Sequence, residues 1–314
     1  MCEEEDEMAR TRFSRSVRAR TRTKINDLPD DVLSHILSFL TTKESVATSI
    51  LSKRWIHLWH KVPNLHFPDI NVDSDESTLL FNEFVYSILV SRDIVGSNSI
   101  NSFHLDIEFD NPNLAFPNIT KWINLVVQRK LNHLHLDLLF QGRMKMPLSI
   151  FTCRTLVSLT LSGFRVTGFS SNQIQLPSLK SIYLQTIEFS EIKDFVLLLA
   201  GCPILEDLQA NDTDFDDGRD NLTIQQYKSL CFPKLTRARI RSFWCDFPAK
   251  VLSNSKSISI NSNLYTNNQV RFNMNMMHST SLYADTDTCD YNFCSIIQLL
   301  DMLVLCPLSL FHWP

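Results

Sequence analysis

The chain has 314 residues, of which 44% are hydrophobic and 20% are charged, and its formal net charge is −4. A chain of this length and apolar content can bury a sizeable core, either as one elongated domain or as a small module joined to a larger one. The near balance of charge excludes a strong overall field that would attract the whole molecule to nucleic acid or to a membrane. Any binding that depends on charge must therefore come from a charged segment or patch of the surface.

Three features indicate that the protein stays inside the cell. The N-terminus lacks the basic and apolar segments of a secretory signal. The longest apolar run, residues 295–313, is interrupted by Gln298, Asp301 and Pro307, which predicts a packed helix and no membrane span. The eight Cys residues form no C-x-x-C pair and lie mostly in apolar runs, which favours reduced, buried thiols. We expect a location in the nucleus, the cytoplasm or both.

Residues 1–24 are predicted to form a disordered arm. Residues 3–7 are acidic, basic side chains follow at residues 10–24, and hardly any aliphatic side chain lies among them. Such a segment cannot bury enough apolar surface to fold. The alternative is that the basic run is a nuclear-import signal or contacts nucleic acid.

Order is predicted to begin with three short helices in residues 25–67. Pro29 suits the first turn of the first helix, and an apolar series then covers more than one stripe of its surface. A second helix is expected over residues 43–49, and a third would carry Trp55 and Trp59 one turn apart. So small a module cannot enclose all of these side chains, which favours an interface with a partner.

The sequence of this module resembles an F-box. The run L-P-D-D-V-L-x-x-I-L-S-F-L at residues 28–40 is followed by L-S-K-R-W-x-x-L-W at residues 51–59. Both runs are similar to the F-box of the large plant F-box/leucine-rich-repeat families. The resemblance implies docking on a Skp-type adaptor, which would connect the chain to a cullin scaffold and a ubiquitin-conjugating enzyme.

The resemblance also implies which residues dock. The matching positions are Leu28, Pro29, Val32, Ile36, Leu37, Leu40, Leu51 and Trp55. The competing interpretation is that some of them only hold the three helices together. For Leu33, Trp55 and Trp59, the sequence favours packing in the core of the module at least as much as contact with the adaptor.

After a connector at residues 68–100 that contains a helix, residues 101–268 repeat one pattern. An apolar residue, two variable residues and then two apolar residues separated by one recur about every 23 to 30 residues, as leucine-rich repeats do. The repeats start at Leu131, Leu156, Leu179, Leu205 and Leu235, and further strands are expected at Phe103 and Ile258. The predicted fold is α+β: a three-helix F-box followed by an irregular α/β solenoid with a parallel sheet.

The residues between the strand leucines are predicted to line an open, concave face, because side chains alternate along a strand. These residues are His133, His135 and Asp137; Ser158, Thr160 and Ser162; Ser181, Tyr183 and Gln185; Asp207, Gln209 and Asn211; and Arg237, Arg239 and Arg241. An arginine stripe can bind carboxylates or phosphates in bidentate fashion, so Tyr183 and the three arginines are the candidate substrate-binding residues. The alternative is an ordinary solvated strand face balanced by its acidic neighbours.

No motif for catalysis, a cofactor or a metal is found in the sequence. Glycine-rich phosphate loops, H-E-x-x-H and G-x-S-x-G are absent from it. The spacing of His278, Cys289 and Cys294 fits no common metal template. We therefore expect a non-catalytic protein without cofactor or metal.

Residues 269–314 match the repeat pattern poorly, so we interpret them as a divergent C-terminal repeat, truncated before the FBD segment that many relatives carry. The leading hypothesis for the whole chain is the substrate receptor of a Skp–cullin–F-box ubiquitin ligase whose repeats bind an unknown protein target. Nucleic acid is not an expected partner. The alternatives are a nuclear scaffold or nucleic-acid-associated protein that acts through the basic arm, and a truncated, nonproductive F-box protein.

Overall fold

The computed structural model describes most of the chain between Lys24 and Phe243 and three short segments beyond. The described residues are 24–94, 96, 99–109, 118–139, 143–169, 174–217, 232–243, 257–262, 270–275 and 283–284. The predicted arm lies outside them apart from Lys24, and so does most of the divergent segment at residues 269–314, with His278, Cys289 and Cys294. The interpretation of that segment as a truncated repeat stays a prediction.

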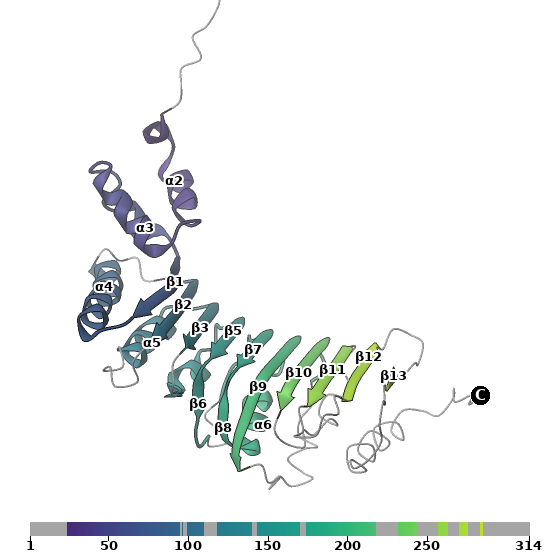
Figure 1. Cartoon of the computed structure of the whole chain (residues 1–314). Helices are drawn as coiled ribbons and strands as arrows, with labels where there is room; N and C mark the ends of the chain where they lie inside the picture. The colour runs from purple at the N-terminus through teal and green to yellow at the C-terminus, as the bar shows by residue number, and fades with distance from the viewer. Residues whose placement is uncertain are drawn as a thin grey trace, which may run out of the picture.

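The N-terminal module contains two short α-helices at one end of a curved row of strands (Figure 1). Helix α2 (Asp30–Leu37) begins directly after Pro29. Helix α3 (Thr42–Ala47) begins with a capping box, in which the Glu44 amide donates to the Thr41 hydroxyl and the Glu44 carboxylate accepts from the Thr41 amide. The remaining helical turns are the 3₁₀ segments η1 (Ile25–Asp27), η2 (Thr48–Ile50) and η3 (Leu58–Lys61).

The third α-helix predicted for this module is wrong. The chain after Ser52 forms turns and then η3. The consecutive residues Leu58, Trp59 and His60 are all buried. Short 3₁₀ turns are frequent connectors, and η3 leads from the helices of the module to the first strand of the sheet.

A single curved sheet runs through the rest of the described chain, with helices in the connections between its strands (Figure 1). Its parallel strands, in spatial order, are β1 (Asn64–Val72), β2 (Ser102–Phe109), β3 (His133–Leu139), β5 (Ser158–Ser162), β7 (Ser181–Gln185), β9 (Asp207–Asp217), β10 (Arg237–Phe243) and β11 (Ser257–Ser262). This curled parallel sheet is the architecture of a leucine-rich-repeat solenoid, as the sequence predicts.

The crossovers between the strands are helical or contain short outer strands. The helical ones are α4 (Asp75–Ile94), α5 (Ile119–Val127), η4 (Leu148–Thr152) and α6 (Ile192–Ala200). A second, smaller parallel ladder joins β4 (Met144–Lys145), β6 (Phe164–Val166) and β8 (Glu188–Glu191) to the end of β9. None of the described helices combines the length and the apolar character needed to span a bilayer.

The repeating leucines form the solenoid core. Leu131, Leu156, Leu179, Leu205 and Leu235, which start the predicted repeats, are each at most 2% exposed. Each lies two residues before a strand, and the apolar residues three and five positions further along the chain are buried with it. Full burial of such a side chain contributes roughly 1.5–3 kcal/mol before entropy is considered, so these leucines are structural.

The sheet differs from the sequence prediction at both ends. Strand β1 starts at Asn64 and pairs in parallel with β2, so the sheet begins well before residue 101. After β11 the direction changes, because β12 (Val270–Asn275) pairs antiparallel with β11, and β13 (Tyr283–Ala284) antiparallel with β12. Residues 263–269 are too short a connection for a parallel crossover, which needs about a dozen residues, but are enough for a hairpin.

A buried arginine fastens the N-terminal module to the sheet. Arg92 of α4 is fully buried and donates to the carbonyl oxygens of Val62, at 2.7 Å, and Ser99, at 3.3 Å. Burial, together with the nearby positive charge of Arg129, lowers the pKa of Arg92 to about 10, which still leaves it charged at neutral pH. Charged hydrogen bonds to buried carbonyls are strong, so this junction is a fixed part of the fold.

Candidate functional site

The open face of the sheet consists of three side-chain rows that cross the strands in register. The middle row runs through His66, His104, His135, Thr160, Tyr183, Gln209 and Arg239. The rows on either side place His133 with Ser158, Ser181, Asp207 and Arg237, and Asp137 with Ser162, Gln185, Asn211 and Arg241. The structure thus brings together all fifteen residues that alternation assigned to one face.

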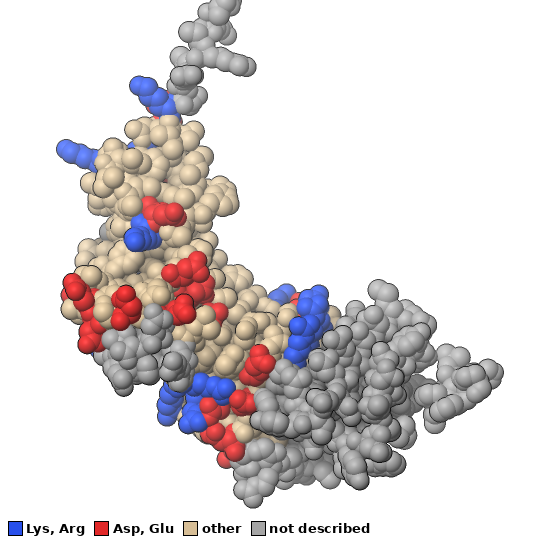
Figure 2. Space-filling view, in the orientation of Figure 1, with Lys and Arg blue, Asp and Glu red and all other residues tan. Residues whose placement is uncertain are grey.

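The arginine stripe lies at the β10 end of this face. Arg237, Arg239 and Arg241 are exposed, and Figure 2 shows basic side chains gathered over β10. Arg237 donates to Asp207 of β9 at 2.7 Å. Among the described side chains, Arg239 and Arg241 make no ion pair. Acidic neighbours therefore balance only part of the stripe.

Tyr183 stands at the centre of the open face, half-buried and fixed in place. Its hydroxyl donates to Gln185 at 2.7 Å and accepts from the side-chain amide of Asn211 at 3.2 Å. A fixed aromatic ring with a polar tip is a favourable contact for a protein partner, because it loses little conformational entropy on binding.

A histidine cluster occupies the opposite end of the same face. It consists of His66, His104, His135 and Asp106. Asp106 lies 2.7 Å from the Nε2 atom of His104 and 3.0 Å from that of His135. The rings of His104 and His135 stack with centroids 4.0 Å apart, and His66 meets His104 edge-on at 4.5 Å. Burial and the neighbouring His104 lower the pKa of both His66 and His135, which favours their neutral forms.

Sequence reasoning missed most of this cluster. His66 and His104 lie on β1 and β2, for which the sequence pattern predicted no open-face residues. The three histidines are also far apart in the chain. The available signal was the pair of similar runs H-L-D at residues 104–106 and H-L-D at residues 135–137. Only the strand register places these runs side by side.

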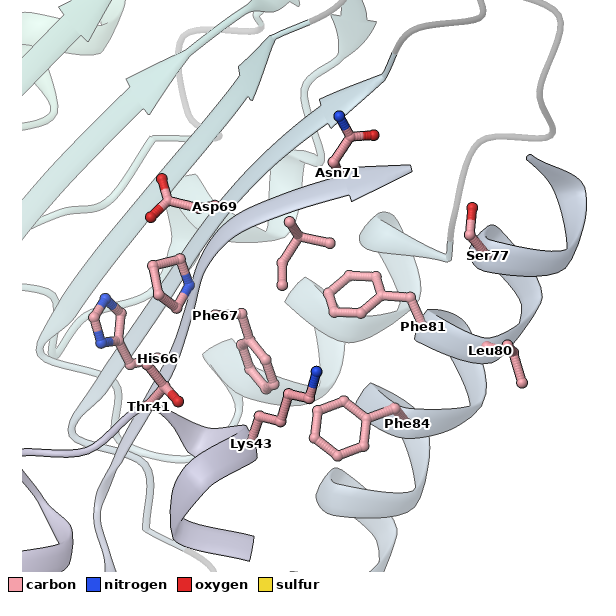
Figure 3. Close-up of a pocket in the computed structure, with 12 residues that line it drawn as sticks. Thr41, Lys43, His66, Phe67, Asp69, Asn71, Ser77, Leu80, Phe81 and Phe84 are labelled. Carbon is pink, nitrogen blue, oxygen red and sulfur yellow. The ribbon is translucent and has the colours of Figure 1, made fainter. Parts of the chain in front are cut away.

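A recess lies where the N-terminal module meets the sheet. Its volume is about 490 Å³, and it opens between α3, β1 and α4, with Phe67, Phe81 and Phe84 among its walls and Lys43 beside them (Figure 3). Strand β1 has a bulge beside this recess, where its register with β2 shifts between Phe67 and Ile70. The walls of the recess are mainly apolar, and Lys43, His66 and Asp69 add polar groups to its lining.

The first helix of the module has two neighbouring apolar stripes, one buried and one exposed. Leu33 and Leu37 are fully buried, whereas Val32 is 42% exposed, Ile36 37% and Phe39 75%. The exposed residues follow a spacing of four and then three, so they form one stripe along α2 and the turn after it. The prediction of apolar surface facing two ways therefore holds in the structure.

The predicted docking residues divide between surface and core. Pro29, Val32, Ile36 and Leu51 are exposed, and Leu28 and Leu40 are half-buried against the core. Leu37 and Trp55 are 0% and 2% exposed and pack in the small core of the module, so a docking contact by either of them stays a prediction. Four further apolar residues of the module are exposed and were not among the predicted docking residues: Ile25, Phe39, Ile50 and Ile56.

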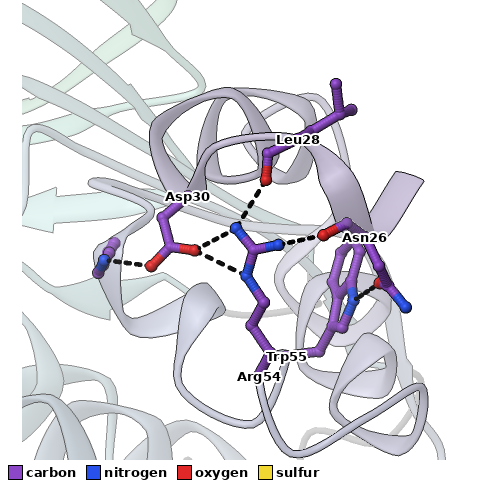
Figure 4. Close-up of polar contacts among 6 residues, drawn as sticks. Asn26, Leu28, Asp30, Arg54 and Trp55 are labelled. Atoms are coloured by element: carbon purple, nitrogen blue, oxygen red, sulfur yellow. Dashed lines mark hydrogen bonds and ion pairs between the residues drawn. The ribbon is translucent and has the colours of Figure 1, made fainter. Parts of the chain in front are cut away.

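Hydrogen bonds from Arg54 fix the segment that precedes the exposed stripe (Figure 4). The guanidinium donates to Asp30 at 2.6 and 2.9 Å and to the carbonyl oxygens of Asn26 and Leu28. The indole of Trp55 donates to the Asn26 side chain at 2.8 Å. Hydrogen bonds from Arg54 and Lys61 lower the pKa of Asp30. The R-W pair of the sequence motif therefore holds the start of α2 in one conformation.

The matches to known families agree with this architecture. The F-box domain family matches residues 25–67, and the family described as "FBD-associated F-box protein At5g56370, LRR repeats" matches residues 119–236. The class of this protein is therefore an F-box domain followed by leucine-rich repeats.

Particular relatives come from Arabidopsis thaliana. The F-box/LRR-repeat protein At4g14103 is 33% identical over 246 residues, which cover 76% of this chain and 61% of the relative. The FBD-associated F-box protein At4g13985 is 35% identical over 221 residues, 67% of this chain and 46% of the relative. The F-box/FBD/LRR-repeat protein At1g78750 is 36% identical over 207 residues, 62% and 43% respectively. The chain thus matches less than two thirds of the length of each.

Proposed function

We propose that this chain is a non-catalytic substrate receptor of a Skp–cullin–F-box ubiquitin ligase, acting in the nucleus, the cytoplasm or both. The observation that carries the proposal is the exposed stripe of Val32, Ile36 and Phe39 on an F-box helix whose other stripe is the module's core. A small module gains stability by covering such a stripe. F-box domains in general bind Skp-type adaptors, and that adaptor is the proposed partner.

Docking and target binding would use two separate surfaces, because the exposed stripe of α2 and the open face of the solenoid come from different parts of the chain. The docking stripe belongs to the first helix, whereas the arginine stripe and Tyr183 belong to later strands of the solenoid. A receptor built in this way holds a target near a conjugating enzyme carried by the cullin, and raises the effective concentration of a target lysine without supplying catalytic groups.

Capture of the adaptor tests the docking half of the proposal. The tagged full chain, expressed in plant cells, should recover a Skp-type adaptor and a cullin. Leu28→Ala together with Pro29→Ala should reduce that recovery several-fold, because both residues lie at the entrance of α2 beside the exposed stripe. Undiminished recovery of both proteins by the double variant would remove these two residues from the docking surface.

Charge reversal on the open face tests the target-binding half. Arg237→Glu with Arg239→Glu should remove most acidic or phosphorylated partners from the captured set, because two guanidinium groups become carboxylates that repel such partners. Quantitative mass spectrometry of the captured proteins measures this. The matched control is Lys193→Glu with Lys234→Glu, which reverses two exposed charges off this face. An unchanged set of partners in the arginine variant would mean that the stripe is an ordinary solvated face.

A further inference from the structure

Two histidines and one carboxylate converge at the β2–β3 end of the open face. His104 and Asp106 are two residues apart on β2 and so point to the same face, and His135 is the in-register neighbour of His104 on β3. One nitrogen from each histidine and one oxygen of Asp106 all lie within 4.8 Å of one another. All three side chains are partly exposed, at 29%, 29% and 34%, so solvent and ions reach them.

Hydrogen bonding within the protein leaves this group of carboxylates incompletely satisfied. The buried Oδ1 atom of Asp137 has no hydrogen-bond partner among the described residues, and the Oδ1 atom of Asp106 has only the Nε2 atom of His135, 3.0 Å away, as a donor. Asp106 and Asp137 are also direct neighbours across β2 and β3. Like charges facing one another on adjacent strands destabilise a sheet, and buried acceptors without a donor cost free energy. A cation at this place would offset both effects.

We propose that His104, Asp106 and His135 bind a divalent transition-metal ion of the zinc class. Two imidazole nitrogens and one carboxylate oxygen are a donor set that suits zinc, cobalt or copper, whereas calcium and magnesium require mostly oxygen ligands. Zinc binds these atoms at about 2.0–2.2 Å in a tetrahedron, which places ligands about 3.3 Å apart. The Oδ2 atom of Asp106 lies 2.7 Å from the Nε2 atom of His104, and its Oδ1 atom lies 3.0 Å from the Nε2 atom of His135, so each histidine nitrogen is close to that spacing from one of the two carboxylate oxygens.

Only a small rearrangement is needed to bind the ion. The stacked imidazoles lie at 5° to one another, so their nitrogen lone pairs run nearly parallel and do not yet converge on one point. Rotation about χ2 of either histidine makes them converge, and this torsion has a broad minimum. The fourth position of the tetrahedron faces the open side of the sheet, where water completes the coordination. Asp137 lies beside the site as an outer carboxylate.

Cobalt titration of the untagged full chain tests the proposal directly, because Co²⁺ in such a site gives visible absorption bands that report its ligand geometry. The chain, freed of metal with a chelator, should develop these bands at one equivalent of Co²⁺ and lose them when Zn²⁺ displaces the cobalt. Asp106→Asn keeps the shape of the side chain and removes its charge, and it should weaken binding by at least about tenfold, as should His135→Gln.

The matched control is His133→Gln. His133 lies on the same strand and the same face, is more exposed than His135 and is outside the triad. Its loss should leave cobalt and zinc binding unchanged. Cooperative urea unfolding of each variant checks its fold, and His135→Gln provides the result if Asp106→Asn does not fold.

Two results would overturn the proposal: no cobalt bands with the wild-type chain, or bands of equal intensity and affinity in Asp106→Asn and His135→Gln. The second result would place the bound ion elsewhere in the chain. Recovery of the adaptor should be the same for Asp106→Asn as for the wild type, since the triad is separate from the docking stripe. Failure of the metal site and failure of the proposed function are thus distinguishable.

Discussion

Val32→Asp together with Ile36→Asp should abolish recovery of the Skp-type adaptor. The two side chains are 42% and 37% exposed in the free chain, so a carboxylate at either position reaches solvent and is not buried in the fold. In the proposed complex the exposed part of each side chain would be covered, and loss of each apolar contact costs about 1 kcal/mol, because more than half of each side chain is already buried in the free chain. Two losses and two buried carboxylates together weaken binding by a factor on the order of a hundred or more. Interferometry or calorimetry with the purified adaptor measures this directly.

The matched control uses exposed apolar residues outside the F-box. Leu79→Asp with Ile94→Asp changes two residues of α4 that are 58% and 81% exposed, and it should leave adaptor affinity unchanged. Equal loss in both double variants would indicate general damage to the chain. If the Val32 and Ile36 variant bound the adaptor as tightly as the wild type, the exposed stripe would not be the docking surface.

Gly163→Ala should be the most destabilising small substitution in the described solenoid. Gly163 lies between β5 and β6 with φ at +79°, and a Cβ atom there would lie 2.0 Å from the carbonyl oxygen of Leu138. The positive φ costs an alanine roughly 1–2 kcal/mol, and the clash with backbone adds overpacking strain of about 1–3 kcal/mol. We expect the free energy of unfolding to fall by about 3 kcal/mol in urea denaturation.

Gly168→Ala separates the two causes of that loss. Gly168 has φ at +63°, and nothing lies within 4 Å of the Cβ position. Its alanine variant therefore carries only the backbone strain, about 1–2 kcal/mol. Similar destabilisation by the two substitutions would show that the close approach of Gly163 to Leu138 contributes nothing measurable.

The leucine spacing was enough to predict the sheet, because the pattern is local. Leu156 and Leu179 each lie two residues before a strand and so predict where it starts. Alternation along the strand then assigns Thr160 and Tyr183 to the open face without knowledge of the adjacent strand. The spacing of apolar residues did not predict the local structure around Trp59. Apolar residues one turn apart suggest an α-helix, but the chain there forms turns and the 3₁₀ segment η3.

The F-box helix shows the limit of periodicity within one element. Its two apolar stripes were visible in the sequence, yet nothing in the pattern said which stripe packs inward. Val32 and Leu37 are both aliphatic and were both assigned to docking, whereas the structure exposes the first and encloses the second. The choice depends on where Trp55 and Leu58 pack, and they come from another part of the chain.

The sequence by itself determined the class of fold, the central strands and the F-box module, since these depend on residues a few positions apart. Tertiary structure alone decided which apolar side chains remain exposed and how the polar ones group on the open face. The union of His104, Asp106 and His135 is the clearest case: Asp106 is two residues from His104 on the same strand, but His135 reaches them only through the register of β2 with β3. Register arises from packing of the whole solenoid, which no local pattern contains.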